Sequence, residues 1–314
     1  MKIGIYGYGN LGKGCEWGAS RLSGYEVAGV FTKRDPREIK TLFPKTPVFP
    51  AEDVEKHKNE IDAMLICSGS STSLPEISPY LAEYFNIVDS FDTHSSIKDH
   101  FRRVDAASKA GGKIAVISAG WDPGIFSLFR GLFTNLFPEG NTVTYWGPGV
   151  SQGHSEAIRS LEGVIDARQY TLPVKEDTDA VRRGERDSVR HKRVCYVVTK
   201  DGANREKIEK SIVTMPGYFE GYETEVNFVT AEELYEKYSV LSHGGGVIST
   251  GSVGEDGSCR AEISLSLGSN PQFTARVMLL YASAAKKLCD MGESGCRTVA
   301  DIPPAYIFRE KYMI

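Results

Sequence analysis

From Met1 to Gly124 the chain alternates between short apolar runs and longer segments in which apolar residues recur at helical spacing. The apolar runs predict strands at 3–6, 26–31, 61–67, 86–90 and 113–118. The helical spacing predicts helices at 15–22 and 96–110, and the proline-containing segment 43–53 is expected to be irregular. Alternating strands and helices indicate a doubly wound parallel sheet with right-handed crossovers.

Beyond Gly124 the pattern changes, because strands outnumber helices. Strands are predicted at 142–146, 167–172, 193–199, 223–229, 246–250 and 260–267, and helices at 125–136, 203–214, 231–237 and 273–291. This pattern favours an α+β domain with a mixed or antiparallel sheet, and we expect the last helix to pack back on the first domain. The charged segment 175–193 has few apolar residues and is expected to be a mobile loop that acts as a lid.

Composition limits the class of protein. The 314 residues suit two domains, and 41% apolar with 25% charged residues is typical of a soluble globular protein. A net charge of −4 argues against nucleic-acid binding, and no apolar run reaches the roughly 20 residues of a membrane span. The chain begins directly with a strand, and its six cysteines include no C-x-x-C pair. We therefore expect a cytoplasmic enzyme with reduced thiols.

Glycines directly after the first strand indicate a dinucleotide site. Gly7, Gly9 and Gly12 have the G-x-G-x-x-G spacing, at the point where a helix is expected to begin. The first glycine permits a tight turn, the second lets a pyrophosphate approach the backbone, and the third lets helix and strand pack closely. Amides at the helix start would face the phosphates. The predicted cofactor-binding residues of this turn are Gly7, Tyr8, Gly9, Asn10, Leu11 and Gly12.

The turn after the second strand predicts which dinucleotide binds. NAD-binding domains carry an acidic residue here, which binds the ribose 2′-hydroxyl. This chain instead has Thr32-Lys33-Arg34, whose positive charges and guanidinium donors suit a 2′-phosphate. A solvated basic turn, with Asp35 paired to these side chains, is the alternative. We predict NADP as the cofactor.

Polar residues follow three further strands of the first domain. Cofactor contacts are predicted at Cys67, Ser68, Gly69, Ser70, Ser90, Phe91, Asp92, Ala119, Gly120, Trp121, Asp122 and Pro123. Since the carboxyl ends of parallel strands face one crevice, Asp92 and Asp122 are expected to approach the cofactor. Two carboxylates suit a cationic group of a substrate better than nucleotide phosphates. The alternative is that both aspartates cap the helices that follow.

The second domain offers residues that could hold a polar substrate. Arg193 could bind a carboxylate with two parallel hydrogen bonds. The acidic and histidine residues Asp92, His94, Asp99, His100 and His154 match no common spacing of metal ligands, so we predict no metal site.

Five motifs together identify a family. They are Gly7-Tyr-Gly-Asn-Leu-Gly12, Phe91-Asp-Thr-His94, Gly120-Trp-Asp-Pro-Gly124, Tyr145-Trp-Gly-Pro-Gly149 with Ser151-Gln-Gly-His-Ser155, and Met215-Pro-Gly-Tyr-Phe-Glu-Gly-Tyr-Glu223. The chain resembles meso-diaminopimelate dehydrogenases over nearly its whole length. The resemblance implies NADP-dependent, reversible oxidative deamination of the D-centre of meso-2,6-diaminopimelate. The implied products are L-tetrahydrodipicolinate, ammonia and NADPH, in a cytoplasmic homodimer that serves lysine and diaminopimelate biosynthesis.

The resemblance also implies roles for single residues. Asp92 and Asp122 would lie beside the nicotinamide, as catalytic residues that bind the reacting end of the substrate. The other implied substrate-binding residues are Trp146, Gln152, Gly153, Thr171, Arg193, His243 and Asn270. The last four of these would hold the unreactive L-end. The segment between Thr171 and Arg193 differs in length from the family pattern, so Arg190 is an alternative to Arg193. Thr32-Lys33 replaces Ser-Arg, which keeps the charge and loses one guanidinium.

These observations predict the organisation of the whole chain. Residues 1–121 would form a Rossmann-type NADP-binding domain, with 271–314 packing back on it, and 122–270 an α+β domain for dimerisation and substrate binding. The amino group must lose a proton before the imine forms, and Asp92 and His154 are both possible acceptors. Two other functions remain open: another NADP-dependent amino-acid or semialdehyde oxidoreductase of the same plan, and a non-catalytic NADP-binding sensor.

Overall fold

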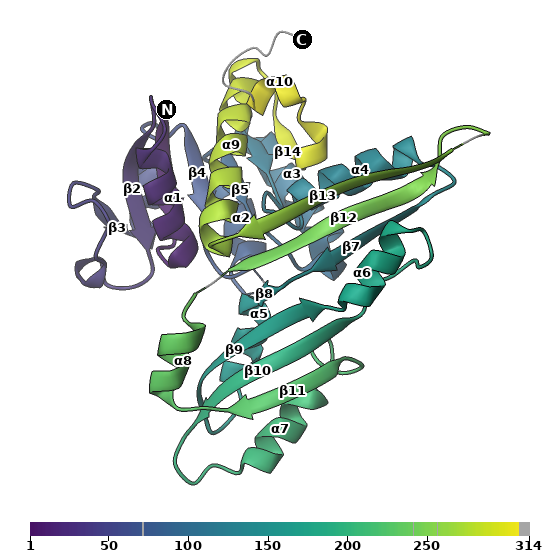
Figure 1. Cartoon of the computed structure of the whole chain (residues 1–314). Coiled ribbons are helices and arrows are strands. Elements are labelled where there is room, and N and C mark those ends of the chain that lie inside the picture. The colour runs from purple at the N-terminus through teal and green to yellow at the C-terminus, as the bar shows by residue number, and fades with distance from the viewer. Residues whose placement is uncertain (71, 241, 256, 308–314) are drawn as a thin grey trace. The chain divides into compact units, whose positions relative to one another are not determined.

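The computed structural model describes residues 1–70, 72–240, 242–255 and 257–307. The chain forms two compact units, Met1–Leu128 with Pro271–Ile314, and Phe129–Asn270 (Figure 1). Two parts of the sequence-based predictions lie outside the described residues. They are Ser71, in the polar turn after the third predicted strand, and 308–314, at the end of the segment expected to return to the first domain.

The first unit is built on one parallel sheet. Its strands are β1 (Lys2–Tyr6), β2 (Glu26–Thr32), β3 (Val48–Pro50), β4 (Ala63–Ile66), β5 (Ile87–Asp89), β6 (Ile114–Val116) and β14 (Gly295–Arg297). The seven strands lie in the order β14-β6-β5-β4-β1-β2-β3, and all neighbours are parallel. From β1 the chain adds β2 and β3 on one side, and then β4, β5 and β6 on the other. The order of strands therefore reverses between β1 and β4, which is where nucleotides bind in such sheets. The predicted doubly wound sheet is confirmed.

Helices cover both faces of this sheet (Figure 1). They are α1 (Asn10–Ser20), α2 (Leu74–Ala82), α3 (Ile97–Gly111), α9 (Asn270–Asp290) and the short α10 (Pro304–Ile307). Ile3 and Ile5 belong to an apolar cluster with residues of α1 and α9, whereas Tyr6 belongs to a second cluster with residues of α2 and α3. Side chains alternate between the two faces of a strand, so one short strand supplies both cores. Full burial of each isoleucine contributes roughly 1.5–3 kcal/mol.

The second unit contains two smaller sheets. Its strands are β7 (Asn141–Trp146), β8 (Gly149–Val150), β9 (Val164–Pro173), β10 (His191–Thr199), β11 (Glu223–Phe228), β12 (His243–Ser252) and β13 (Ser258–Leu267). One sheet has the order β11-β10-β9-β8 and the other β13-β12-β7. Strand β10 is antiparallel to β9 and parallel to β11, whereas β12 is antiparallel to both its neighbours. The predicted α+β fold with a mixed sheet is confirmed.

Helices of the second unit pack on these sheets. They are α5 (Gln152–Arg159), α6 (Lys175–Arg182), α7 (Arg205–Val213) and α8 (Ala231–Tyr238), together with the second half of α4 (Ile125–Leu136). Ile158 of α5 and Ile212 of α7 are fully buried in one cluster with Cys195 of β10. Tyr238 of α8 stacks on Tyr196 of β10 with ring centroids 3.7 Å apart. No helix among the described residues is long and apolar enough to cross a membrane.

The prediction that the whole of 175–193 is a loop is wrong, because only 183–190 lie outside a helix or strand. The first eight residues of 175–193 form α6, and β10 begins at His191. Val181 packs in an apolar cluster with Tyr145, and the buried carboxylate of Asp177 accepts bonds from Nε and the backbone N–H of Arg190. The Arg190 guanidinium lowers the pKa of Asp177 to about 2. This order depends on a buried carboxylate bound by an exposed arginine, which a search for apolar periodicity does not detect.

Several element boundaries also differ from the prediction. Helix α1 begins at Asn10 instead of residue 15, because the glycine turn itself starts the helix. Helix α2 was not predicted, since Pro75 and Pro79 disguise it, and α5 was not predicted either. The short strands β3 and β14 at the two edges of the parallel sheet were also missed.

Candidate active site

The glycine turn between β1 and α1 has the shape that a dinucleotide phosphate requires. Gly7 has a φ of +93°, and a Cβ on it would lie 2.8 Å from the carbonyl oxygen of Cys67. A Cβ on Gly12 would lie 2.3 Å from the carbonyl oxygen of Gly7, so the helix packs closely on the turn. At Gly9 no atom lies within 4 Å of the Cβ position, and no side chain caps α1. Open space before uncapped amides at a helix start favours an anion.

The remaining residues of this turn support its shape. Asn10 and Leu11 form the first turn of α1, and the Tyr8 side chain is buried. The Tyr8 hydroxyl donates to the carboxylate of Glu16, which is itself fully buried. The hydroxyl oxygen of Tyr8 and Oε2 of Glu16 each accept the backbone N–H of Leu42 at 2.9 Å. Glu16 thus ties the glycine turn to the 42–43 segment. Sequence reasoning missed it, because a charged residue inside a helix gives no sign that it is buried.

The basic turn after β2 lies against the glycine turn. Nη2 of Arg34 donates to the carbonyl of Tyr8 at 2.7 Å, and the Arg34 N–H donates to the hydroxyl of Thr32 at 3.1 Å. The alternative expected Asp35 to pair with Lys33 or Arg34, and it does not. Its carboxylate instead accepts both Nε and Nη2 of Arg37, which lowers the pKa of Asp35. Asp35 therefore does not occupy the guanidinium of Arg34, which lies beside the turn.

The other predicted cofactor contacts lie where neighbouring strands of the parallel sheet end. Cys67, Ser68, Gly69 and Ser70 follow β4, Ser90, Phe91 and Asp92 follow β5, and Ala119, Gly120, Trp121, Asp122 and Pro123 follow β6. The hydroxyl of Ser70 accepts the Asp92 N–H at 2.9 Å, which links two of these loops. Asp92 is exposed, and the residues before the helical segments that follow it are Thr93 and Ser96. Asp92 is therefore not their capping residue.

In the second unit, Thr171 and Arg193 lie opposite each other on β9 and β10. Nη1 of Arg193 donates to the Thr171 hydroxyl at 2.5 Å, and its guanidinium lies 4.3 Å from the ring centroid of Tyr222. Burial lowers the pKa of Arg193. Arg190 is bound instead by Asp177, so this geometry favours Arg193 for a carboxylate. Tyr222 was not among the predicted residues, although it lies in one of the family motifs.

Two glycines bring further predicted residues to Thr171. A Cβ on Gly147 would lie 2.1 Å from the Thr171 carbonyl oxygen, and one on Gly149 would lie 2.3 Å from Cα of His243. Gly149 also pairs with Thr171 in the sheet. The close approach of three strands thus requires glycine at both positions of the Trp-Gly-Pro-Gly motif. It places Thr171, His243 and Trp146 in one part of the second unit.

His191 contacts Trp146, a predicted substrate residue, and sequence reasoning missed it. Its Nε2 accepts the backbone N–H of Trp146 at 3.1 Å, and the two rings lie 5.6 Å apart. Burial, followed by the charge of Arg193, lowers the pKa of His191 to about 4. The available signal was its spacing, because residues two apart in a strand share a face and His191 precedes Arg193 by two.

The start of α5 carries the other predicted substrate residues. Gln152 and Gly153 are exposed in its first turn, which Ser151 caps. Nδ1 of His154 lies 2.8 Å from the Ser151 hydroxyl, and burial lowers the pKa of His154 to about 4. Asn270 is half-buried at the first position of α9.

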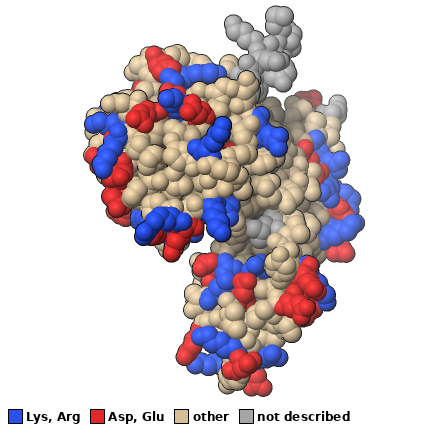
Figure 2. Space-filling model, turned by 90° about the vertical axis from the view of Figure 1, so that its left-hand side faces the viewer, with Lys and Arg blue, Asp and Glu red and all other residues tan. Residues whose placement is uncertain are grey.

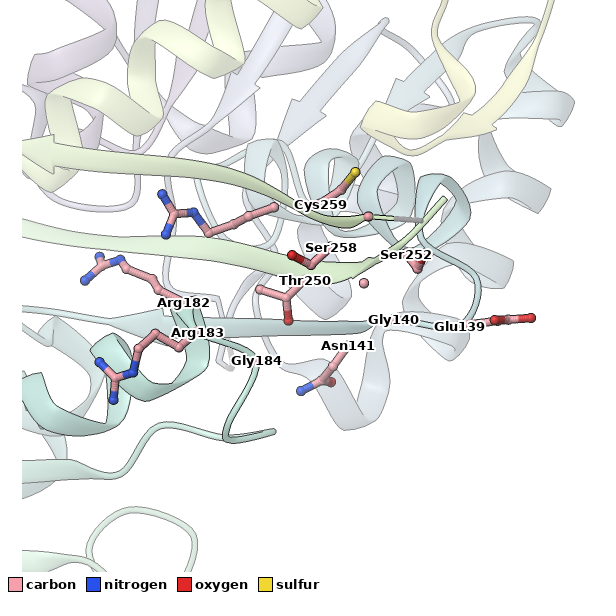
Figure 3. Close-up of a pocket in the computed structure, with 13 residues that line it drawn as sticks. Glu139, Gly140, Asn141, Arg182, Arg183, Gly184, Thr250, Ser252, Ser258 and Cys259 are labelled. Carbon is pink, nitrogen blue, oxygen red and sulfur yellow. The ribbon is translucent and has the colours of Figure 1, made fainter. Parts of the chain in front are cut away.

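A separate hollow of 720 Å³ opens in the second unit beside α6 (Figure 3). Arg182 and Arg183 line it, but Arg182 is already bound by Glu262 and Arg183 by Glu185. None of the predicted substrate residues lines this hollow. On the face shown in Figure 2, basic and acidic side chains are interspersed. Among the described residues, no group of three or more His, Cys, Asp or Glu side chains could hold a metal ion.

Comparisons with known proteins define the family. Residues 120–269 match the model of the diaminopimelic acid dehydrogenase C-terminal domain. The chain is 49% identical to the meso-diaminopimelate D-dehydrogenase of Acetivibrio thermocellus over 98% of this chain and 94% of that protein. The chain belongs to the meso-diaminopimelate D-dehydrogenase family. The resemblance seen in the five motifs is thereby confirmed.

Solved structures of the family support the fold as well. Corynebacterium glutamicum DAP dehydrogenase in complex with DAP superposes with a TM-score of 0.93 at 39% identity, covering 99% of this chain and 96% of that one. An engineered D-amino acid dehydrogenase bound to NADP⁺ superposes with a TM-score of 0.89 at 38% identity, covering 99% and 97%. Both similarities extend over the two units, so the fold class predicted from the sequence is confirmed.

Proposed function

We propose that this protein catalyses the NADP-dependent, reversible oxidative deamination of the D-centre of meso-2,6-diaminopimelate. The products are L-tetrahydrodipicolinate (after ring closure of the keto acid), ammonia and NADPH, and the reverse direction supplies diaminopimelate for lysine biosynthesis. Family membership, at 49% identity over 98% of the chain, carries this proposal. The named relatives confirm the enzyme class predicted from the sequence, and the NADP⁺-bound neighbour confirms the predicted cofactor.

The first unit fits the cofactor. The open, uncapped turn at Gly9 would hold the pyrophosphate, and Lys33 with Arg34 would hold the 2′-phosphate. The loops after β4, β5 and β6 would hold the nicotinamide half. The bound cofactor would supply the hydride acceptor. We assign cofactor binding to 1–121 with 271–314, and substrate binding and dimerisation to 122–270.

The chemistry of meso-diaminopimelate explains the other residues. The substrate has two ammonium and two carboxylate groups, so its site needs acids and bases together. We assign the L-end carboxylate to Arg193 and Thr171, which already face each other. We assign the ammonium at the reacting end to Asp92 and Asp122. Binding of the L-end then determines which stereocentre reaches the cofactor. The remaining assigned contacts are Trp146, Gln152, Gly153, His243 and Asn270.

Two groups of the chain could accept the ammonium proton. His154 is neutral at neutral pH, because its pKa lies at about 4, and Asp92 is exposed at a strand end. We propose to separate them by pH–rate profiles. If Asp92 is the acceptor, Asp92→Asn abolishes the low-pH limb of the profile and His154→Gln keeps it, and the reverse result assigns His154.

The activity is tested with purified meso-, LL- and DD-diaminopimelate and NADP, by the absorbance of NADPH. We expect turnover with the meso form and none with the LL form. Turnover of a different amino acid alone would favour another oxidoreductase of the same plan. Binding of NADP without turnover of any amino acid would favour a sensor.

We also propose that the enzyme is a cytoplasmic homodimer. Leu132 and Leu136 lie one turn apart on α4 and are each about half exposed, at 49% and 52%. Exposed apolar side chains at such spacing are typical of protein interfaces. Leu132→Glu with Leu136→Glu should give monomers by light scattering, whereas Ile165→Glu, at a residue 56% exposed on β9, should not. A monomeric unmodified protein would refute the proposal. Cell fractionation tests the location.

A further inference from the structure

The carboxylate of Asp89, at the end of β5, is bonded by four different residues of the first unit. Asp89 is fully buried and accepts four hydrogen bonds. Oδ2 accepts the hydroxyl of Ser78 at 2.7 Å and Nε2 of His100 at 2.8 Å. Oδ1 accepts the backbone N–H groups of Phe91 at 3.1 Å and Ser118 at 3.0 Å. A buried carboxylate is retained only where such bonds replace its hydration.

The two backbone donors belong to the two loops that carry the proposed catalytic aspartates. Phe91 directly precedes Asp92, and Ser118 begins the loop that leads to Asp122. One oxygen of Asp89 therefore links the ends of β5 and β6. The carbonyl of Asp89 also accepts the N–H of Ala119 at 2.8 Å, which adds a second link between the same strands.

Ser118 shows that this link imposes a conformation. Its φ is +56°, and it is the one non-glycine residue of the described chain in the left-handed region. Its hydroxyl is buried with no partner among the described residues. Side chains other than glycine occupy this region at an energetic cost, so surrounding bonds must maintain it. The bond from Ser118 to Asp89 is the side-chain contact that does so.

His100 of α3 completes the arrangement from the other side. Its ring stacks on Phe91, with centroids 4.1 Å apart and an interplanar angle of 17°. Nε2 bonds to Asp89, while the buried Nδ1 has no partner among the described residues. A carboxylate oxygen accepts, so the hydrogen of this bond lies on Nε2. His100 thus contacts both Asp89 and the residue next to Asp92.

We infer that Asp89 and His100 are positioning residues, which hold Asp92 and Asp122 in the mutual arrangement that the reaction requires. Neither is among the residues assigned to the substrate, and the inference rests on the function proposed above. A purely structural role predicts loss of stability alone. Positioning predicts a slower chemical step in correctly folded enzyme, because misplacement of reacting groups by about 1 Å can cost roughly 100-fold in rate.

The test compares His100→Leu with His100→Gln. Leucine fills the space and removes the donor, whereas glutamine keeps a donor to Asp89. Asp89→Asn is an isosteric third variant. The matched control is His57→Leu, since His57 also pairs with a carboxylate, that of Glu60 at 3.0 Å, and packs on a phenylalanine in the same unit, but bonds to neither loop.

Four quantities are measured: the melting temperature, the Kd for NADP, kcat per NADP-binding site, and the isotope effect on kcat with substrate deuterated at the D-centre. For His100→Leu and Asp89→Asn we expect kcat to fall roughly 10- to 100-fold, with an isotope effect at least as large as in the unmodified enzyme and a Kd within about threefold. His100→Gln should keep most of the rate. His57→Leu should lose stability and keep its rate.

An unchanged kcat per binding site in His100→Leu, or an equal loss in His57→Leu, would overturn the inference. Hydrogen exchange gives a readout that needs no activity: amides at 90–93 and 118–122 should exchange at least tenfold faster in Asp89→Asn, and those of β2 should not. Equal protection in both proteins would also overturn it. An inactive unmodified enzyme would refute the proposed function, and the exchange data would still decide this inference.

Discussion

Arg34 should determine the preference for NADP over NAD. Its backbone N–H bonds to Thr32 and its Nη2 to the carbonyl of Tyr8, so the side chain is already held beside the glycine turn. Nε and Nη1 have no acceptor among the described residues, and they are therefore able to donate to a 2′-phosphate. The change Arg34→Ala removes these donors and one positive charge.

The expected magnitude follows from the type of bond. A hydrogen bond to a charged group contributes roughly 1.5–3 kcal/mol, and each 1.4 kcal/mol corresponds to a factor of about ten. Arg34→Ala should therefore raise the Kd for NADP roughly 10- to 150-fold. NAD lacks the phosphate, so its Kd should change by less than about threefold. Fluorescence titration of the purified enzyme with each cofactor measures both constants.

Arg37→Ala is the matched control, because it removes the same charge three residues further along. Arg37 is bound by Asp35 through Nε and Nη2, so its donors are already used. Its Kd for NADP should change by less than about threefold at physiological salt, where exposed charges are screened beyond about 8 Å. An equal effect of both substitutions would refute the specific contact. Equal weakening of NAD and NADP by Arg34→Ala would instead assign Arg34 to support of the turn.

Three further predictions concern the turn, the carboxylate contact and pH. Gly9→Ala should weaken NADP binding and leave the melting temperature unchanged, because its Cβ meets open space. Gly12→Ala should weaken NADP binding and also lower the melting temperature, because its Cβ would meet a carbonyl oxygen at 2.3 Å. Equal melting temperatures of the two variants would contradict this. Arg193→Met should raise KM for meso-diaminopimelate at least tenfold and leave the Kd for NADP unchanged, and a change in the Kd alone would contradict the assignment. Burial lowers the pKa of His191 to about 4, so the unfolded state binds the extra proton first and the free energy of unfolding should fall as pH decreases from about 6.5 to 4. Denaturant titrations should show a shallower fall for His191→Gln. An unchanged dependence of the free energy of unfolding on pH in this variant would contradict the prediction.

The sequence alone predicted the features that depend on neighbours along the chain. The spacing of Gly7, Gly9 and Gly12 predicts the turn, since each glycine acts within a few residues of its own position. The alternation of apolar runs predicts the parallel sheet, because burial on both faces makes each strand a short continuous apolar segment. Family motifs then predicted the family, which the relatives confirm, and the reaction proposed above follows from it.

Local patterns failed where a contact joins distant residues. Segment 175–193 was predicted to be a loop because its charged side chains were taken to be solvated. Asp177 is instead buried, and its bonds to Arg190 replace its hydration. The spacing of His191 from Arg193 showed only that the two share a face of a strand, whereas its contact with the backbone of Trp146 depends on another strand. Glu16 is a similar case, since it is buried beneath the turn that it supports.

The sequence by itself thus determined the nucleotide turn, the fold class and the family, because these depend on spacing and on apolar periodicity within single elements. The tertiary structure decided which polar residues act together. It placed Arg193 opposite Thr171 through the register of β9 and β10, and it joined the loops of Asp92 and Asp122 through Asp89. The physical reason is that a buried polar group is stable only with its partners, and those partners come from elements that meet only in the folded chain.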